Sequence, residues 1–369
     1  MSQDTLSNVL GSVRLRTAVF YYVSCDGRWA AEAPASREIA AAVMPDADHV
    51  MEYYVLTAGE CWAGIVGEPP IKMQRGDIVL LAQGDPHVVS SEPGMRADPA
   101  IDSYFELGRT QRPFRIHHDN ETVHVDLEGK LPRPTATTGS ANFVGGFIGC
   151  DVRPFNPLLA TLPRLLHLPA DGGSSWSEQL ATFAAAECAA NRPGSEAVLE
   201  RLAEMMFVDA IRRHHDQLPE QSTGWLAALR DRFVGRALAL MHERPSAPWT
   251  IDDLSSQVGL SRSALHERFV SLLGQPPVQY LTSWRMQLAS RKLLEGRSSV
   301  AAVAVDVGYD SEAAFARAFK RLVGMPPAAC DAAIDFLIHR RNRLSAIVEA
   351  KQSLFKGIQW APPPDELPL

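Results

Sequence analysis

The sequence predicts an α+β protein, with strands in the N-terminal part and helices in the rest of the chain. Short apolar runs broken by turn residues fill roughly the first 150 positions, which is typical of a sandwich or barrel. Beyond Pro154 the apolar residues recur every three to four positions, as in amphipathic helices. Near the C-terminus a pattern of two short helices occurs twice. At 369 residues the chain has room for two or three domains.

The strand-rich part is expected to form a sandwich or a barrel of short strands. Turn signals at Gly76-Asp77 and at Gln83-Gly84-Asp85-Pro86 separate the apolar runs. Residues 109–140 are polar and rich in Arg, His, Pro and Thr, so we expect a long loop or a hairpin there. The expected strands are 53–56, 61–66, 78–81 and 142–148.

Two helices are expected in the middle of the chain. Residues 176–190 and 195–214 both have helical periodicity, and the breaker Asn191-Arg192-Pro193-Gly194 separates them. The second helix has an apolar face broad enough for its own core and for a partner. We expect it to mediate dimerisation, with packing inside its own chain as the alternative. That face consists of Val198, Leu199, Leu202, Met205, Met206 and Ile211.

An internal repeat is the most specific feature of the sequence. Leu265, Phe269, Leu272, Gly274, Pro276 and Pro277 recur fifty positions later as Phe315, Phe319, Leu322, Gly324, Pro326 and Pro327. Upstream, Val258-Gly259-Leu260 matches Val307-Gly308-Tyr309 at an offset of forty-nine. The one-residue difference falls in a turn, where an insertion is tolerated.

Each copy has the signals of a helix-turn-helix. Thr250 can cap a first helix, and Ser261 and Ser311 can cap the second helices. Gly259 and Gly308 suit the positive-φ turn between the two. Pro277 can open a further helix expected over 278–294, and at 1.5 Å per residue these residues span roughly 25 Å. That length can hold the two second helices about one DNA turn apart.

The C-terminal part resembles the DNA-binding domain of the AraC/XylS family of transcription regulators over about residues 225–330. The segment SVAAVAVDVGYDSEAAFARAFKRLVGMPP at 299–327 is very similar to that family's C-terminal signature. The chain departs from the family just afterwards, where Ala328-Ala329-Cys330-Asp331 stands in place of the usual aromatic residue and arginine.

The resemblance implies that the second helix of each copy contacts DNA. Arg317 is the leading candidate to read a base, because a guanidinium fork can bind guanine bidentately. Ser311 and Lys320 are expected near phosphates. Glu267 and Glu312 either accept from cytosine or form solvated salt bridges. The full set of implied contacts is Ser261, Arg262, Ser263, His266, Glu267, Ser311, Glu312, Ala313, Ala316, Arg317 and Lys320.

Residues 76–87 resemble the second motif of cupin barrels, with Ala82 in place of the usual proline. Cupin enzymes hold a metal with a His-x-His pair and a carboxylate on an earlier strand. The matching strand here, 53–56, has no such pair, and His49 lacks the required spacing. His117, His118 and His124 are expected in a solvated loop of the polar insert. We therefore expect no metal and no cofactor.

The N-terminal half as a whole resembles the cupin-type sensor domain of one AraC subgroup. The stretches YYVLTAGECW at 53–62 and NPLLATLPRLLHL at 156–168 have this likeness. It implies a small effector bound in the barrel, near Tyr53, Tyr54, Trp62 and His87. The alternative is a barrel filled by its own side chains that serves only as a scaffold for the dimer. Because side chains alternate along a strand, only one of Tyr53 and Tyr54 can face the interior.

Composition and charge exclude several classes of protein. No apolar run reaches the ~18–20 residues of a membrane helix, and the N-terminus does not read as a secretory signal. The five cysteines form no Cys-x-x-Cys pair, so we expect them to be buried and reduced. The net charge is −7, yet residues 225–330 carry 13 Lys and Arg against 9 Asp and Glu. This local excess of positive charge suits a polyanion such as DNA.

Together these features predict a cytoplasmic, non-enzymatic transcription regulator controlled by a small effector. The alternative is a metal-dependent cupin enzyme fused to a DNA-binding domain. The expected partners are double-stranded DNA, the effector and a second copy of the chain, with RNA polymerase a further candidate. The expected domains are a sensor (1–170), a linker with the dimerisation helix (171–224), a DNA-binding domain (225–335) and an extension (336–369).

Overall fold

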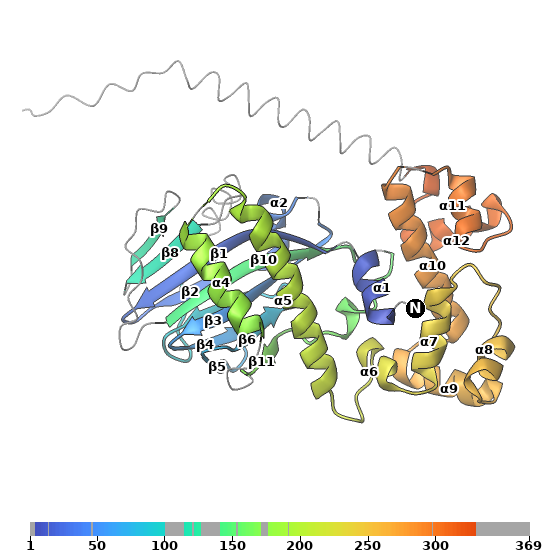
Figure 1. Ribbon diagram of the computed structural model, residues 1–369, viewed down its shortest axis with the longest axis horizontal. Helices are drawn as coiled ribbons and strands as arrows, with labels where there is room; N and C mark the ends of the chain where they lie inside the picture. The colour runs from blue at the N-terminus through green and yellow to red at the C-terminus, as the bar shows by residue number, and fades with distance from the viewer. Residues whose placement is uncertain are drawn as a thin grey trace, which may run out of the picture. The chain divides into compact units, whose positions relative to one another are not determined.

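The computed structural model describes residues 4–13, 15–45, 47–99, 114–119, 122–126, 141–152, 154–170, 176–190, 192–296 and 298–329. The chain divides into two compact units, residues 1–287 and 288–369. The first unit contains the strands and the first pair of repeated helices, and the second contains the second pair (Figure 1). The expected extension at 336–369 lies outside the described residues.

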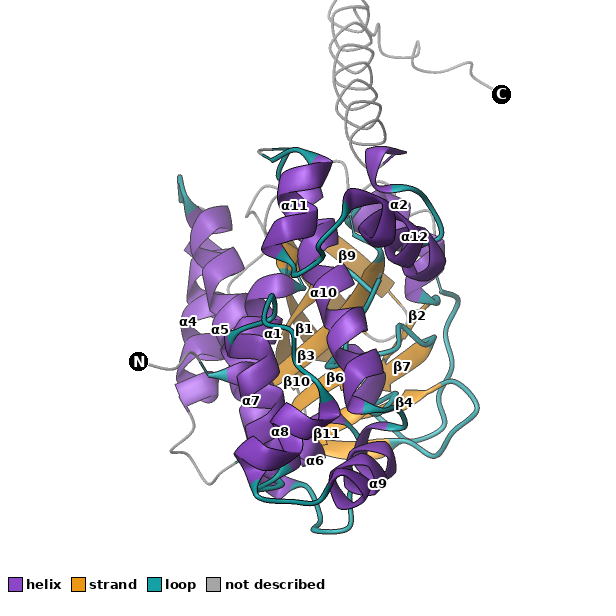
Figure 2. Ribbon diagram, turned by 90° about the vertical axis from the view of Figure 1, so that its right-hand side faces the viewer, coloured by secondary structure: helices purple, strands orange, loops and turns teal. Residues whose placement is uncertain are grey.

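Apart from α1 and α2, the strands come before the helices along the chain, as the α+β prediction requires. Figure 2 shows the strands in orange and the helices in purple. The strands are β1 (Arg16–Asp26), β2 (Ala30–Ala33), β3 (His49–Ala58), β4 (Glu60–Ile65), β5 (Ile71–Gln74), β6 (Ile78–Leu81), β7 (His87–Ser90), β8 (Phe114–Asp119), β9 (Thr122–Asp126), β10 (Ala141–Cys150) and β11 (Leu166–Leu168). The helices are α1 (Thr5–Ser12), α2 (Ser36–Val43), α4 (Trp176–Ala190), α5 (Ser195–Gln217), α6 (Trp225–Arg230), α7 (Val234–Glu243), α8 (Ile251–Val258), α9 (Arg262–Leu273), α10 (Pro277–Leu294), α11 (Val300–Asp306) and α12 (Glu312–Val323), with a 3-10 turn at Leu159–Thr161.

The strands form two sheets, which fits the sandwich form of the expected sandwich or cupin-like barrel, and within the described residues the sheets do not close into one barrel. One sheet has seven strands in the order β11-β6-β3-β10-β1-β8-β9, and the other has four in the order β2-β7-β4-β5. Neighbouring strands pair antiparallel, except that β1 pairs parallel with β8. In the polar insert, β8 and β9 form an antiparallel hairpin where a loop or hairpin was expected.

The apolar core of the first unit draws side chains from both sheets. All ten residues of β10 are buried. This central strand is covered on both faces, because helices α4 and α5 pack on the other side of the seven-stranded sheet (Figure 1). Two-sided burial explains why residues 143–148 form a continuous run of apolar residues and glycines instead of an alternating pattern.

The main sequence-predicted elements are confirmed. The expected strands fall within β3, β4, β6 and β10, apart from Val66, which follows the end of β4. Helix α4 has the expected bounds, α10 begins one residue before the expected Val278, and α5 runs three residues beyond the expected His214. Among the described residues, no helix is long and apolar enough to cross a membrane.

Candidate nucleic-acid interface and interior polar cluster

The first helix pair has the caps that the sequence predicts. Thr250 Oγ1 accepts a hydrogen bond from the Asp253 backbone N–H at 3.1 Å, and Asp253 Oδ2 accepts one from the Thr250 backbone N–H at 3.0 Å. This reciprocal capping box fixes the start of α8. Gly259 ends α8 at φ 77°, a conformation that glycine adopts without strain. Ser261 then caps α9 by accepting from the Ala264 backbone N–H at 3.2 Å.

The second pair is built in the same way. Ser299 caps α11, and Ser311 caps α12 by accepting from the Ala314 backbone N–H at 3.2 Å. Gly308 occupies the turn between them with φ 84°. Phe315 and Phe319 are fully buried, as are Leu265 and Phe269 at the matching positions of α9. The repeat in the sequence is therefore a repeat of capped, close-packed helix pairs.

The predicted DNA contacts lie on the sides of α9 and α12 that face away from these buried residues. Arg317 and Lys320 on α12 are exposed, and Ala316, just before Arg317, is half-buried. On α9 the exposed Arg262 pairs with Asp252 at 2.9 Å. The cap serines use their oxygen as an acceptor, so each hydroxyl can still donate to a phosphate. The other implied contacts, Ser263, His266, Glu267, Glu312 and Ala313, are also exposed.

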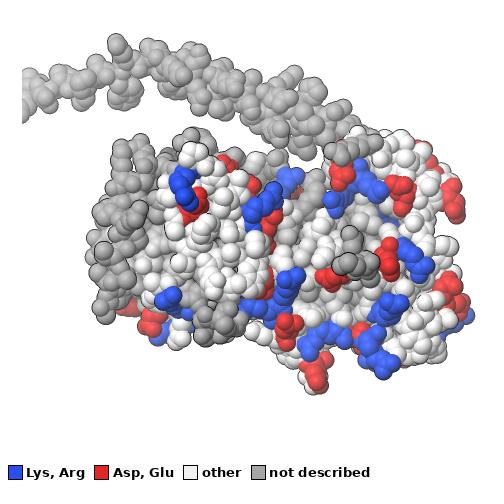
Figure 3. Space-filling model, viewed as in Figure 1, with Lys and Arg blue, Asp and Glu red and all other residues white. Residues whose placement is uncertain are grey.

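Charge on the visible surface is mixed. Lys and Arg side chains are interspersed with Asp and Glu side chains in Figure 3, and no patch of one sign dominates that face.

A buried aromatic cluster supports the first helix pair, and the sequence analysis did not find it. Tyr280 on α10 accepts a hydrogen bond from Trp225 Nε1 at 2.8 Å and contacts His242 Nε2 at 2.8 Å. The His242 ring stacks on Trp284, with ring centroids 4.1 Å apart. Burial lowers the pKa of His242 to about 3, so this histidine is neutral at pH 7.

In the first unit, β3 places two polar side chains between the sheets. Glu52 and Tyr54 are two residues apart and therefore point to the same side of the strand. That side is the core, because Tyr54 and Leu56 both belong to the core cluster. Glu52 has only 1% of its surface exposed. This spacing is the same as that of a cupin His-x-His pair, with different residue types.

Tyr21 reaches Glu52 across a glycine. In the sheet, β10 lies between β1 and β3, and Tyr21 on β1 is in register with Gly145 on β10. A Cβ atom on Gly145 would lie 2.4 Å from Cε2 of Tyr21. The missing side chain therefore lets the Tyr21 ring lie over β10, and its hydroxyl donates a hydrogen bond to Glu52 Oε1.

His87 joins this group from the opposite sheet. Its Nδ1 lies 2.9 Å from the carbonyl oxygen of Asp85, which can only accept, so the proton is assigned to Nδ1. Its Nε2 lies 2.7 Å from the Tyr54 hydroxyl and 3.5 Å from Glu52 Oε2. We call Tyr21, Glu52, Tyr54 and His87 the interior polar cluster.

Two of the four predicted effector residues belong to this cluster and two do not. Tyr54 and His87 face the core. Tyr53 faces the opposite side of β3, where a Cβ atom on Gly146 would lie 2.9 Å from its hydroxyl oxygen. Trp62 is half-buried, and its neighbours Cys61 and Ala63 belong to the core cluster, so it points out of the core. Tyr53 and Trp62 are therefore wrong as interior residues. Glu52 and Tyr21 were missed because neither stands in the cupin motif.

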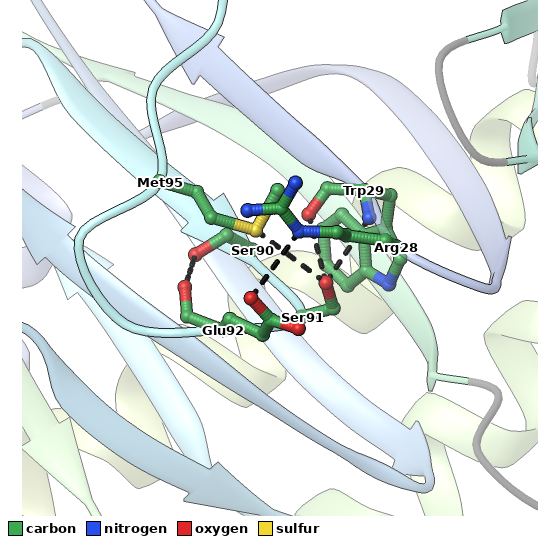
Figure 4. Close-up of polar contacts among 6 residues, drawn as sticks. All are labelled: Arg28, Trp29, Ser90, Ser91, Glu92 and Met95. Atoms are coloured by element: carbon green, nitrogen blue, oxygen red, sulfur yellow. Dashed lines mark hydrogen bonds and ion pairs between the residues drawn. The ribbon is translucent and has the colours of Figure 1, made fainter.

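Trp29 forms part of the wall beside the cluster. Its ring centroid lies 6.0 Å from that of Phe143 and 5.9 Å from that of His118. Figure 4 shows how its backbone is held at the edge of the four-stranded sheet: its N–H donates to Ser91 Oγ at 3.0 Å, and the Ser91 hydroxyl donates to its carbonyl oxygen at 3.2 Å. Beside it, Arg28 donates to Glu92 at 3.2 Å.

The expected solvated histidines are in fact in strands. His117 and His118 lie on β8 and His124 on β9, with His117 and His124 in register. His118 is buried, and burial, with His117 nearby, lowers its pKa to about 4. His49 contacts the carbonyl oxygen of Ala82 at 2.7 Å through Nε2, so it supports the cupin motif instead of the cluster.

The described cysteines are buried, and the described side chains that could bind a metal do not gather into a site. Four of the cysteines, Cys25, Cys61, Cys150 and Cys188, are buried and free, as expected. Burial raises the pKa of Cys61 to about 12, which keeps its thiol protonated. Cys330 lies outside the described residues. Within the described ranges, no three His, Cys, Asp or Glu side chains come together as a metal site would require.

Comparisons with known proteins match both parts of the chain. A cupin family model matches residues 4–216, and a helix-turn-helix domain model matches residues 254–332. A protein of Streptomyces lividans named as an AraC-like transcription regulator is 33% identical over 332 residues, which cover 88% of this chain and 96% of that protein. One of the same description from Streptomyces antibioticus is 32% identical over 327 residues, covering 88% and 97%. The transcriptional regulator AlkR of Acinetobacter baylyi is 28% identical over 327 residues, again covering 88% and 97%.

A cupin domain followed by two capped helix-turn-helix pairs defines a DNA-binding transcription regulator. The identity and coverage of the Streptomyces proteins place the chain more narrowly. It belongs to the AraC-like transcription regulators.

Proposed function

We propose that this regulator reads two adjacent major-groove segments, one with α9 and one with α12. The observation that supports this most strongly is the exposed face of each of these helices, held by the same serine cap and the same pair of buried side chains. A helix held this rigidly can place its N-terminal side chains at base edges. Helix α10 covers 18 residues, about 27 Å, and joins the two pairs.

The roles of the contact residues follow from their chemistry. Arg317 has no ion pair within the described part of the chain, so its guanidinium is free to bind a guanine. Lys320 is placed one turn further along α12 and would bind a phosphate. Arg262 would exchange its surface pair with Asp252 for DNA, which costs little because exposed pairs are weak. Ser261, Ser263, His266 and Glu267 on α9, and Ser311, Glu312, Ala313 and Ala316 on α12, complete the proposed surface.

The experiment is a protection footprint of the full chain on the DNA flanking its own gene. We expect two protected segments on one face of the DNA, about one helical turn apart. A single protected segment, or none at low salt, would contradict two-part reading.

We further propose that the chain is non-enzymatic and that a small effector binds between the two sheets of the cupin domain. Tyr54 and His87 support this, because they bring polar groups into an aromatic-walled core. Nothing in the described ranges favours the alternative of a metal-dependent cupin enzyme, since the cluster contains only one carboxylate and one imidazole. A regulator acting on chromosomal DNA would work in the cytoplasm.

We also propose a homodimer formed through α4 and α5. Four apolar side chains on these helices remain exposed: Trp176, Phe183, Val198 and Met205, at 37–50%. Those on each helix are seven residues apart and so share one face. An exposed apolar stripe of this kind is typical of a protein interface.

RNA polymerase is a further proposed partner of the regulator. The domain limits at residues 170, 224 and 335 remain predictions.

A further inference from the structure

The interior polar cluster contains one acceptor without a donor. Glu52 Oε1 accepts the hydroxyl of Tyr21, but Oε2 has no hydrogen-bond partner, although the side chain is buried. Among the described residues, no lysine or arginine pairs with Glu52. A buried carboxylate with one unsatisfied oxygen is strongly unfavourable in the absence of a counter-charge.

His87 does not supply the missing donor in this arrangement. Its Nδ1 proton is directed to Asp85, and its Nε2, 2.7 Å from the Tyr54 hydroxyl, is assigned as the acceptor of that hydroxyl. The distance of 3.5 Å between Nε2 and Glu52 Oε2 is longer than the ~2.7–2.9 Å of a charge-assisted hydrogen bond. The two tyrosine hydroxyls serve Glu52 Oε1 and His87 Nε2, and no hydrogen-bond donor is left for Glu52 Oε2.

The cluster occupies the positions at which cupin enzymes hold a metal, and its residue types indicate which kind of ligand it can bind. Glu52 and Tyr54 have the spacing of a cupin His-x-His pair, and His87 stands at the motif histidine. These four side chains do not suit a metal as its ligands. Two of them are tyrosines, whose hydroxyl groups already form hydrogen bonds with Glu52 and His87. A hydrogen-bonding ligand suits them better.

On the basis of the effector site proposed above, we propose that the effector is an organic cation, a primary amine whose ammonium group binds Glu52 Oε2. The ammonium supplies both the missing donor and the missing positive charge. Aromatic rings pack beside the cluster: Phe143 lies 5.6 Å from Tyr54 and Phe147 lies 6.0 Å from Tyr21, measured between ring centroids. Such rings favour an apolar skeleton and attract a cation through their faces.

Binding at this position also provides a means of regulation. Glu52 and His87 have 1% and 2% of their surfaces exposed, so an amine can enter only if the sheets separate locally. The Tyr54–His87 hydrogen bond joins β3 of one sheet to β7 of the other and would have to open. The ligand therefore favours an opened state over the closed one, and a difference of that kind is what an effector requires.

The test uses the full chain and a panel of primary alkyl and aralkyl amines, including benzylamine, each paired with the alcohol and the carboxylate of the same skeleton. Binding is measured by thermal shift and by calorimetric titration. We expect at least one amine to bind ten-fold or more tightly than its alcohol, and the carboxylates not to bind. Glu52→Gln should lose the amine, whereas Glu60→Gln, at an exposed glutamate of β4, should retain it.

Several results would overturn the inference. These are equal binding of amine and alcohol, preferred binding of a carboxylate, stabilisation by Zn²⁺ alone, or no binding by any amine. If Glu52→Gln does not fold, the inference is still tested by the preference of the unmodified chain among amine, alcohol and carboxylate. A footprint on DNA with a carboxylate as effector would refute the amine and leave the proposed function intact. Loss of the footprint would refute the DNA-reading proposal independently.

Discussion

Gly145 is the single residue on which the interior polar cluster most depends. In Gly145→Ala the new Cβ would meet the Tyr21 ring at 2.4 Å and push it away from Glu52. We expect the free energy of unfolding to fall by about 2–4 kcal/mol, from overpacking and from the loss of a donor to a buried carboxylate. Urea unfolding measures it.

The matched control for this variant is a double substitution. Tyr21→Ala removes the ring that the new methyl group strikes, so Gly145→Ala should cost less in that background than alone. If Gly145→Ala lowers the free energy of unfolding by the same amount with and without Tyr21→Ala, the glycine is required for a reason other than the Tyr21 ring.

Buried histidines make stability depend on pH. The folded chain keeps His242 neutral down to about pH 3 and His118 down to about pH 4, whereas in the unfolded chain both bind a proton near pH 6.5. Below pH 6.5 the unfolded state therefore binds more protons, and stability falls as the pH falls. From pH 7 to pH 5 we expect a loss of about 2 kcal/mol for each histidine.

This pH dependence is measured by urea unfolding at the two pH values. His242→Gln should be less stable at pH 7 but should lose less stability on acidification. His266→Gln, at an exposed position on α9, should retain the wild-type difference between the two pH values. If His242→Gln retains it too, another group controls the acid response.

At the scale of elements, the structure changes which residues of α5 can test dimerisation. From sequence alone, the six apolar residues of the α5 face could not be distinguished. In the structure, Leu199 and Met206 are 1% and 3% exposed and pack inside their own chain. Val198 and Met205 are 39% and 47% exposed. We expect Met205→Lys to yield a folded monomer by sedimentation and Met206→Lys to unfold the chain. A wild-type chain that is monomeric at micromolar concentration without DNA would contradict the dimer.

The elements that sequence patterns predicted best are those fixed by local signals. Serine caps and glycine turns act within a few residues, so α8, α9, α11 and α12 could be placed from the printed sequence alone. The interior polar cluster could not, because it depends on register. Glu52 precedes the expected strand 53–56, and Tyr21 reaches it only across a third strand. Which of Tyr53 and Tyr54 faces the core was likewise decided by the pairing of β3 with β10.

At the scale of the whole molecule, the two helix pairs should act as one DNA reader with separable chemical roles. Arg317→Ala should weaken binding to the target by about 1–3 kcal/mol and relax the preference at one base pair, because a bidentate contact to a base is lost. Lys320→Ala should weaken binding to all sequences alike and lower the slope of log K against log salt by about 0.9, because one phosphate contact is lost. Arg37→Ala is the matched control, since it removes an exposed charge from α2 in the cupin domain. Fluorescence anisotropy of the full chain on target and scrambled duplexes, at several salt concentrations, measures all three. If Arg317→Ala weakens target and scrambled DNA equally, α12 binds the backbone only, and base reading must then rest on α9.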